Sequence, residues 1–330
     1  MTAVARAFWV RAPGAGEIRP VEIRDPDVGE VRVRTVHSGV SRGTETLVFR
    51  GGVPEDQYAA MRAPFQEGDF PGPVKYGYLN VGVVDQVGDD GSRDLLGQTV
   101  FCLHPHQTAY VVPADAVILV PDRVPAERAV LAGTVETAIN AVWDAKPLIG
   151  DRIAVVGGGM VGLCVARLLV GIEGTEVTVV DVDERHAPAA LALGADFALP
   201  ADAPSGRDLV VHTSATGSGL QLSLDLLGPE GEVIDLSWYG DLEVGLRLGG
   251  AFHSGRLAIR ASQVGVVSRS RRSRRTTRDR LRLALDLLRD PAFDVLITGT
   301  SPFADLPRVM RDLASGELHA LCHTISYDED

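Results

Sequence analysis

The chain has 330 residues, of which 45% are hydrophobic and 23% charged, and this is enough for two domains with separate hydrophobic cores. The formal net charge of −12 argues against nucleic-acid binding, because a polyanion would be repelled. Residues 1–10 lack the apolar stretch of a signal peptide, and no apolar run reaches membrane-spanning length. We therefore expect a soluble, cytoplasmic protein with no membrane partner.

The first 120 residues have the pattern of antiparallel β-structure. Apolar and polar residues alternate between glycines and prolines, as in the segments 30–36, 81–84 and 109–112. The pattern changes near Ala126, and residues 129–145 are predicted to form a helix. A β domain is therefore expected to precede a part of the chain with a different fold.

The next segment carries glycines at a diagnostic spacing. A buried strand at residues 152–156 leads into a glycine-rich turn, and a helix follows over residues 163–170. The glycines allow a tight turn and a close approach of the backbone to a pyrophosphate, which free N–H groups at the helix N-terminus then bind. The residues that we assign to this contact with a dinucleotide are Gly157, Gly159, Met160, Val161 and Gly162.

Asp181 follows the second strand of this unit, residues 176–180. A carboxylate at this place accepts hydrogen bonds from the adenosine ribose hydroxyls and repels a phosphate group. NAD(H) is therefore favoured as the cofactor. NADP(H) stays open, because Arg185 and His186 lie only a few residues further on.

Strands and helices alternate beyond Asp181. Strand-like segments at 208–212 and 231–236 enclose a helical segment at 220–227. This alternation implies a doubly wound parallel sheet, so the fold class is α/β. We expect that sheet to expose an edge near Val233 to Leu236. An arginine-rich run then precedes a helix at 277–289, and a strand, a short helix and a final strand close the chain.

Two segments resemble the medium-chain dehydrogenase/reductase superfamily, the relatives of alcohol dehydrogenase. Residues 39–45, Gly-Val-Ser-Arg-Gly-Thr-Glu, look like the first active-site loop of that family, and residues 301–317 look like its closing segment. The resemblance covers essentially the whole chain. It implies a GroES-like antiparallel catalytic domain at 1–134, an inserted Rossmann domain at 135–264, and a C-terminal segment at 265–330 that returns to the catalytic domain.

A closer resemblance is to a zinc-free branch of this superfamily. The Ser-Arg-Gly-Thr-Glu loop and the helix at 136–143 look like those of bacteriochlorophyllide hydroxyethyl dehydrogenase-like proteins. The positions that hold zinc in the zinc alcohol dehydrogenases correspond to Ser41, Tyr78 and Gly133. These residues cannot supply the thiolate and imidazole ligands that catalytic zinc requires. We therefore expect no zinc and no other metal.

Without a metal, hydride transfer needs another group to protonate the anion that develops on the substrate. The resemblance places Tyr78, Ser41 and Thr44 on loops that face the nicotinamide, with Tyr78 the first choice as proton donor and Ser41 the second. His104 and His106 lie on one short loop without a third metal ligand, and they are predicted as proton relays.

Further cofactor contacts follow from the same resemblance. Arg42 corresponds to a cation on the pyrophosphate, and Thr137 to a threonine on the nicotinamide side. Ser214, Ser237 and Trp238 follow the ends of later strands, where ligands of doubly wound sheets bind.

Two sets of charged residues have more than one interpretation. An arginine that the family carries is missing near Ala320, and the arginines at 271–275 either replace it or form a solvated face. Glu45 and Glu136 are acid or base groups only if burial raises their pKa.

These features predict a zinc-independent NAD(P)(H)-dependent oxidoreductase with a small-molecule substrate. It would transfer a hydride to or from a C=O/CH–OH group, or to a C=C or C=N bond. The alternative is a non-catalytic dinucleotide-binding protein with a redox-responsive or structural role, which the loss of all three zinc ligands keeps open. A homodimer is expected, because an uncovered sheet edge invites pairing with a second copy.

Overall fold

The structure is a computed structural model, and it describes residues 3–327. The chain divides into two compact units. The first contains the chain up to Gly133, Leu285–Arg289 and the segment that begins at Ile297, and the second contains Thr134–Ala284 and Asp290–Leu296. No helix within residues 3–327 is both long and apolar enough to cross a membrane.

The first unit consists of two sheets and short helices. Its elements are β1 (Ala3–Ala12), β2 (Ala15–Ile23), β3 (Glu30–Val40), α1 (Arg42–Phe49), β4 (Glu67–Gly68), β5 (Val74–Lys75), β6 (Asn80–Val87), β7 (Thr99–Cys102), β8 (Ala109–Pro113), β9 (Ile118–Leu119), α2 (Ala126–Ala129), β16 (Ile297–Pro302), α9 (Leu306–Ser315) and β17 (Cys322–Ser326). The smaller sheet has the strand order β2-β1-β5-β4, and the larger has the order β16-β17-β3-β6-β7-β9, with β8 also paired to β3. The pairs are antiparallel except for β16 with β17, so the expected antiparallel β domain is confirmed.

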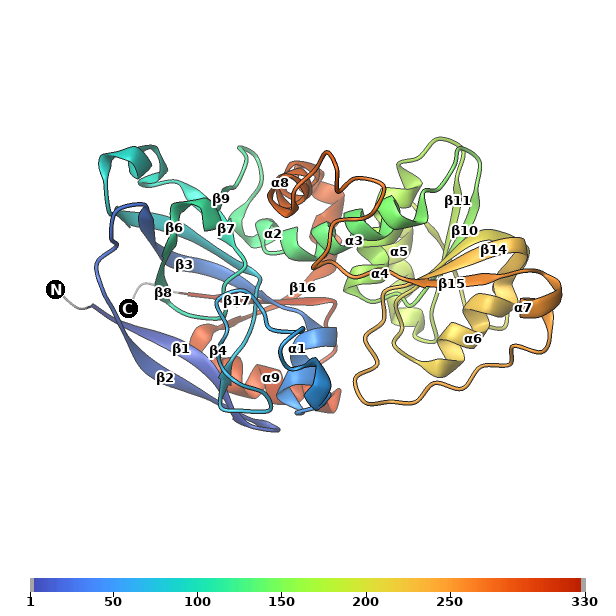
Figure 1. Cartoon of the computed structure of the whole chain (residues 1–330), viewed down its shortest axis with the longest axis horizontal. Helices are drawn as coiled ribbons and strands as arrows, with labels where there is room; N and C mark the ends of the chain where they lie inside the picture. The colour runs from blue at the N-terminus through green and yellow to red at the C-terminus, as the bar shows by residue number, and fades with distance from the viewer. Residues whose placement is uncertain (1–2, 328–330) are drawn as a thin grey trace. The chain divides into compact units, whose positions relative to one another are not determined.

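The chain's tail joins the larger sheet of the first unit. Strand β17, near the end of the chain, pairs with β3, and Figure 1 shows the two strands side by side. The alternating sequence pattern that predicted β3 matches the burial of its side chains. Val31 and Val33 are fully buried, whereas Arg32 and Arg34 are only partly buried. Val84 and Val112 from the neighbouring strands complete this core.

The second unit is a doubly wound parallel sheet with helices. Its elements are α3 (Ala132–Ala145), β10 (Arg152–Val156), α4 (Met160–Val170), β11 (Glu176–Val180), α5 (Ala187–Ala192), β12 (Asp196–Ala198), β13 (Arg207–His212), α6 (Gly217–Leu226), β14 (Leu227–Asp235), α7 (Ala251–Ser254), β15 (Ala258–Ala261) and α8 (Thr277–Leu287), of which the first two residues of α3 and the last three of α8 belong to the first unit. The strand order is β12-β11-β10-β13-β14-β15, and the pairs between these neighbours are all parallel. The predicted α/β class with a Rossmann-type sheet is confirmed.

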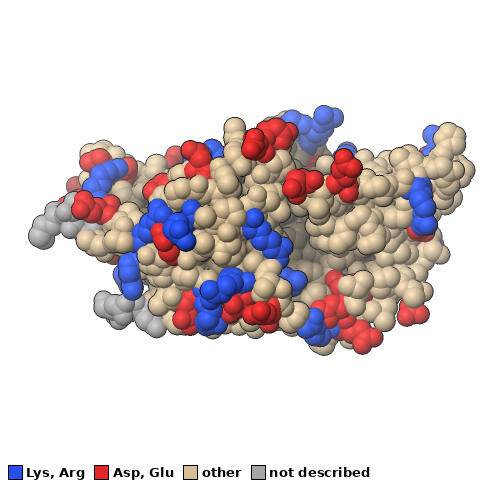
Figure 2. Space-filling view, turned by 90° about the horizontal axis from the view of Figure 1, so that it is seen from below, with Lys and Arg blue, Asp and Glu red and all other residues tan. Residues whose placement is uncertain are grey.

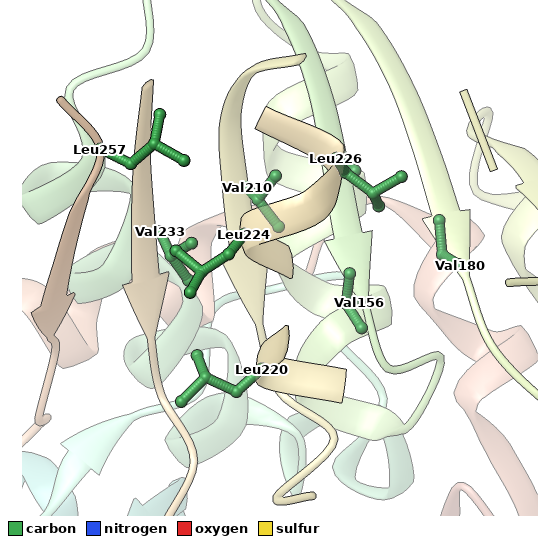
Figure 3. Close-up of a cluster of buried hydrophobic side chains, with 9 residues drawn as sticks. Val156, Val180, Val210, Leu220, Leu224, Leu226, Val233 and Leu257 are labelled. Atoms are coloured by element: carbon green, nitrogen blue, oxygen red, sulfur yellow. The ribbon is translucent and has the colours of Figure 1, made fainter. Parts of the chain in front are cut away.

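Helix α6 covers part of this sheet through its leucines. Leu220 and Leu224 belong to one buried cluster with Val210 and Val233 of the adjacent strands β13 and β14, and Figure 3 shows Leu224 beside these two valines. All four side chains are at most 5% exposed. Burial of this apolar surface fixes the strands whose carboxyl ends bear the cofactor residues predicted above.

Three predictions for the second half of the chain were wrong in detail. The helix expected at 129–145 is interrupted, because α2 ends at Ala129 and α3 begins at Ala132. The helix expected to reach residue 289 ends at Leu287. The segment 233–236 is not a sheet edge, because Val233 and its neighbours on β14 pair with β15, which the sequence pattern did not indicate. The exposed edge strand on this side of the sheet is β15, with Ile259 at its centre.

The surface carries charges of both signs. Acidic and basic side chains lie interspersed on the face shown in Figure 2. Ion pairs at the protein surface include Arg24 with Glu30 and Arg152 with Asp208. Each exposed pair stabilises the fold only slightly, because water screens its charges.

Candidate functional site

The glycine turn after β10 has the shape of a phosphate cradle. Gly157 has a φ of +110°, and a Cβ there would lie 2.7 Å from Thr213 Oγ1. A Cβ on Gly162 would lie 1.9 Å from the carbonyl oxygen of Gly157. Both positions therefore require glycine, one for the turn and the other for the close contact of α4 with the strand end.

The chain itself does not require glycine at position 159, unlike at the other two positions. A Cβ at this position would meet no protein atom within 4 Å. Gly159 precedes Met160, the first residue of α4, and this helix end has no side-chain cap. The N–H groups at Met160 and Val161 therefore have no side-chain cap at the positive end of the helix, as an anion site requires.

Asp181 lies directly against this turn. Its Oδ2 accepts a 2.5 Å hydrogen bond from the Gly158 N–H and lies 3.2 Å from His186 Nδ1, and its Oδ1 accepts one from the Asp183 N–H. Burial alone would raise the pKa of Asp181, but the hydrogen bonds from His186, Asp183 and Gly158 together lower it. The carboxylate is therefore charged at neutral pH and repels a phosphate placed beside it.

The carboxyl ends of β13 and β14 bring Ser214 and Ser237 together. The Thr213 hydroxyl donates to the Gly157 carbonyl at 2.9 Å, which ties this region to the glycine turn. The Ala215 N–H donates to Ser237 Oγ at 3.0 Å. Trp238 follows in the same segment and is half-buried. Sequence reasoning missed His212 and Asp235 in this region, although each is a polar residue that ends an apolar strand.

Thr137 and Glu136 lie on α3. Thr137 is half-buried. Glu136 is buried and forms a 3.0 Å ion pair with Arg280. Burial raises the pKa of Glu136, although Arg280 opposes this. A raised pKa is what an acid or base role of Glu136 would need. The ion pair with Arg280 gives Glu136 a structural role first.

The hydroxyls of Tyr78, Ser41 and Thr44 form one cluster in the first unit. Burial and the nearby Glu45 carboxylate raise the pKa of Tyr78 to about 12, and hydrogen bonds with the side chains of Ser41 and Thr44 partly oppose this. Tyr78 is therefore protonated at neutral pH and carries a proton to donate. Arg42, the first residue of α1, is exposed and makes no ion pair within the described residues.

A second buried network lies behind this cluster. Glu45 Oε2 lies 2.9 Å from His106 Nε2, and both side chains are at most 3% exposed. The other carboxylate oxygen accepts the Ser41 N–H at 2.8 Å. On the far side, His106 Nδ1 lies 2.6 Å from Ser38 Oγ, which lies 2.8 Å from the Tyr327 hydroxyl. The sequence showed no signal for Ser38, which directly precedes the 39–45 loop, or for Tyr327, which lies near the end of the chain.

His104 differs sharply from His106. Its ring stacks on Tyr110 with ring centroids 3.6 Å apart, and its Nδ1 lies 2.9 Å from the Pro105 carbonyl. Burial and, to a lesser degree, the charge on Lys75 lower the pKa of His104 to about 3. His104 is therefore neutral at physiological pH and accepts a proton poorly. Of the two predicted relays, His106 has the better contacts.

The positions that correspond to zinc ligands do not fit a zinc ion. Ser41 and Tyr78 share a hydroxyl hydrogen bond, and a Cβ at Gly133 would lie 2.6 Å from Leu79 Cδ2. A leucine side chain therefore fills the space beside the third position. Among residues 3–327, no group of three or more His, Cys, Asp or Glu side chains is arranged to hold a metal ion. Neutral hydroxyls and a glycine are not the donor set of catalytic zinc.

The arginine run after β15 is solvated. Arg271, Arg274 and Arg275 line an open hollow of about 410 Å³, and all three are exposed. Helix α8 begins after them at Thr277, capped reciprocally by Thr276 and Asp279. The solvated-face interpretation of this run is the simpler one.

Comparisons with known proteins agree on the fold. No family model matches the chain. In solved structures, the chain is similar to an alcohol dehydrogenase from E. coli CFT073 complexed with NADH, with a TM-score of 0.78 and 18% identity over 98% of this chain and 99% of that one. It is also similar to an alcohol dehydrogenase zinc-binding domain protein from Burkholderia ambifaria, with a TM-score of 0.75 and 20% identity over all of both chains. The chain has the medium-chain dehydrogenase fold.

Sequence relatives point the same way. The chain is 26% identical over 246 residues to (R,R)-butanediol dehydrogenase of Bacillus subtilis, which covers 64% of this chain and 68% of that protein. It is 29% identical over 178 residues to 2-desacetyl-2-hydroxyethyl bacteriochlorophyllide A dehydrogenase of Cereibacter sphaeroides, which covers 48% and 50%. These names support the alcohol dehydrogenase-like family that the sequence motifs indicated.

Proposed function

We propose that this protein is a zinc-independent oxidoreductase that uses NAD(H) to transfer a hydride to or from a C=O/CH–OH group of a small organic molecule. The open space in front of Gly159 carries the cofactor part of this proposal, because a side chain there would collide only with a ligand. The anionic Asp181 supports NAD(H) over NADP(H), since it would repel a 2′-phosphate. The division into a catalytic domain at 1–134 and 265–330 and a Rossmann domain at 135–264 belongs to the same proposal.

Tyr78 is the proposed proton donor. A bound NADH would supply the hydride to the carbonyl carbon. Tyr78 would then give its proton to the carbonyl oxygen as negative charge develops there. The nearby Glu45 disfavours a tyrosinate, so the lost proton has to be replaced promptly. Ser41 and Thr44, which bond to Tyr78, are placed to supply it, and in alcohol oxidation the protons would move in the opposite direction.

The pair of Glu45 and His106 is proposed to support this step. Glu45 holds the Ser41 backbone through one oxygen and His106 through the other. It thereby fixes the loop that carries Ser41 and connects it to the Ser38 and Tyr327 hydroxyls. This row of hydrogen-bonded groups meets Ser41 at its backbone N–H and not at its hydroxyl, so its contacts hold the loop, and the relay role of His106 stays a prediction.

The experiment is a comparison of Tyr78→Phe with Ser41→Ala. Turnover of NADH with a panel of ketones should fall by ~10² to 10⁴ in Tyr78→Phe, with NADH affinity nearly unchanged. Ser41→Ala should lose less. A large loss in Ser41→Ala alone would exchange the two roles, and an equal loss of cofactor binding in Tyr78→Phe would make the ring structural.

The same panel separates the alternatives. Enones and imines extend it to C=C and C=N bonds. A protein that binds NADH tightly but consumes it with no substrate of these classes would instead support the non-catalytic, redox-responsive or structural role that the missing zinc ligands keep open.

A further inference from the structure

His212 and Asp235 form a buried hub that the proposed reaction does not use. They are the last residues of β13 and β14 and are direct neighbours in the register of the parallel sheet. His212 Nδ1 lies 2.9 Å from Asp235 Oδ1. The His212 side chain is 0% exposed and that of Asp235 11%. Burial alone would raise the pKa of Asp235, but its hydrogen bonds, led by that with His212, lower it, so the pair contains a charged carboxylate.

The hub binds both of the loops that follow these strands. On one side, His212 Nε2 lies 2.8 Å from Ser214 Oγ. In the neutral imidazole Nδ1–H donates to Asp235, so Nε2 accepts from the Ser214 hydroxyl. On the other side, Asp235 accepts the Ser237 N–H at 2.9 Å and the Tyr239 hydroxyl at 2.9 Å. One imidazole and one carboxylate therefore fix both loops.

The two loops also bond directly to each other. Ala215 has a φ of +53°, a left-handed conformation that alanine adopts only at a cost. Its N–H donates to Ser237 Oγ, and Ser237 Oγ lies 3.1 Å from His212 Nδ1. The strained turn is thus held by the serine that the hub positions, and loss of the hub would release it.

The position of this hub in the sheet indicates which half of a bound dinucleotide lies over it. The strand order reverses direction between β10 and β13, and ligands of doubly wound sheets bind at that point, outside the carboxyl ends. The glycine cradle follows β10, and Asp181 follows β11 on one side of it. A dinucleotide with its pyrophosphate in the cradle and its adenosine ribose at Asp181 has its other nucleoside half over β13 and β14. That half is the nicotinamide half.

The arrangement of Ser214, His212 and Asp235 also has the distances of a hydrolase triad, but it cannot act as one. A triad histidine must pass its proton to a leaving group, so its ring has to be reachable by substrate. His212 has no exposed side-chain surface, and the one hydrogen bond of Nε2 within the described residues is with Ser214. The hydrogen bonds therefore serve to hold groups in place rather than to activate a nucleophile.

We propose that His212, held by Asp235, is a positioning residue that fixes Ser214 and Ser237 for binding of the nicotinamide half of the cofactor. The inference rests on the proposed function, because it assumes a dinucleotide in the cradle. It predicts that His212 governs cofactor affinity, while the chemical step at Tyr78 continues once cofactor is bound.

The test measures the dissociation constant of NADH by fluorescence, together with KM for NADH and kcat, in four variants. His212→Ala should raise the dissociation constant and KM about tenfold or more, because Ser214 and Asp235 lose their partner, with kcat at saturating NADH within about threefold. His212→Asn should recover most of the affinity, since its amide N–H can still donate to Asp235. Ser214→Ala should give an intermediate loss. Asp208→Asn, at the amino end of the same strand, is the matched control and should bind NADH as the wild type does.

Three other results would overturn the inference, and a variant that does not fold is covered by the remaining ones. If His212→Ala fails to fold, Ser214→Ala and His212→Asn carry the test. Wild-type affinity in the soluble His212 and Ser214 variants overturns the positioning role and leaves the proposed function intact. Absence of NADH and NADPH binding in the wild type overturns both. Labelling of Ser214 by a fluorophosphonate probe, lost in His212→Ala, would show that the serine is an activated nucleophile instead.

Discussion

Gly162 packs so closely on Gly157 that a Cβ at Gly162 would lie 1.9 Å from the Gly157 carbonyl oxygen, whereas a Cβ at Gly159 would meet no protein atom within 4 Å. Two alanine substitutions in one turn should therefore have opposite effects. Gly162→Ala should destabilise the fold by about 1–3 kcal/mol or more, because backbone must move. Gly159→Ala should leave the unfolding midpoint unchanged and weaken NADH binding about tenfold, because its methyl group occupies the phosphate space.

Urea unfolding and NADH titration of the two proteins check this. Unweakened NADH binding in Gly159→Ala would mean that no pyrophosphate lies at this turn, and the assignment of the cradle would be wrong.

Asp181 is expected to set the choice of dinucleotide. NADH should bind more tightly than NADPH. Asp181→Ala should shift the ratio of the two dissociation constants about tenfold toward NADPH, because both the ribose contacts and the repulsion of phosphate are lost. Asp183→Asn is a suitable control, because Asp183 is paired with Arg185 and is not expected to contact the ribose. Dissociation constants for both dinucleotides decide the question, and tighter binding of NADPH by the wild type would contradict it.

The sequence predicted the fold class and the dinucleotide unit because both follow from local patterns. Alternation fixed β3, and glycine spacing fixed the turn at Gly157. The sequence did not predict β15, because its four residues, Ala258–Ala261, are mostly exposed and lack the apolar run of a buried strand. The error at the sheet edge followed from this omission.

The site was predicted less completely than the fold. Tyr78, Ser41 and Thr44 lie together, and their role beside a nicotinamide stays a prediction. The network around His106 was missed: Ser38 lies on β3, which pairs with the strand that follows His106, and Tyr327 is brought to Ser38 by the pairing of β17 with β3. Contacts between residues so far apart in sequence leave no local pattern.

A homodimer remains the expected assembly, now through β15. The outer edge of this strand is uncovered in the described residues, and Ile259 on it is 36% exposed. Light scattering at micromolar concentration should give twice the 35.1 kDa mass of one chain. Ile259→Lys should shift the protein to monomer, because a charge blunts an edge strand. Leu191→Lys, at another exposed apolar residue of the same unit, should stay dimeric, and a monomeric wild type would refute the assembly.

His104 should make stability depend on pH in acid. Its pKa is lowered from 6.5 to about 3 in the folded protein, chiefly by burial. Between these values the unfolded chain binds a proton that the folded chain does not, so the free energy of unfolding falls as the pH drops through this window. This loss of unfolding free energy is up to about 1.4 kcal/mol per pH unit, and it is absent above pH 6.5.

His104→Phe keeps a ring against Tyr110 and cannot titrate. Relative to the wild type, it should gain stability steadily as the pH falls from 6.5 toward 4 in urea unfolding. Stability curves that stay parallel over this range would show that His104 is not held neutral.

The zinc content of the active protein tests the central claim most directly. The sequence resemblance assigns Ser41, Tyr78 and Gly133 to the zinc-ligand positions, and a leucine side chain fills the space beside Gly133. Protein that is dialysed against a chelator and then assayed for NADH turnover should contain far less than one zinc per chain and keep its full activity. Stoichiometric zinc that survives dialysis, or activity that is lost with the chelator and returns with added zinc, would contradict a zinc-independent dehydrogenase.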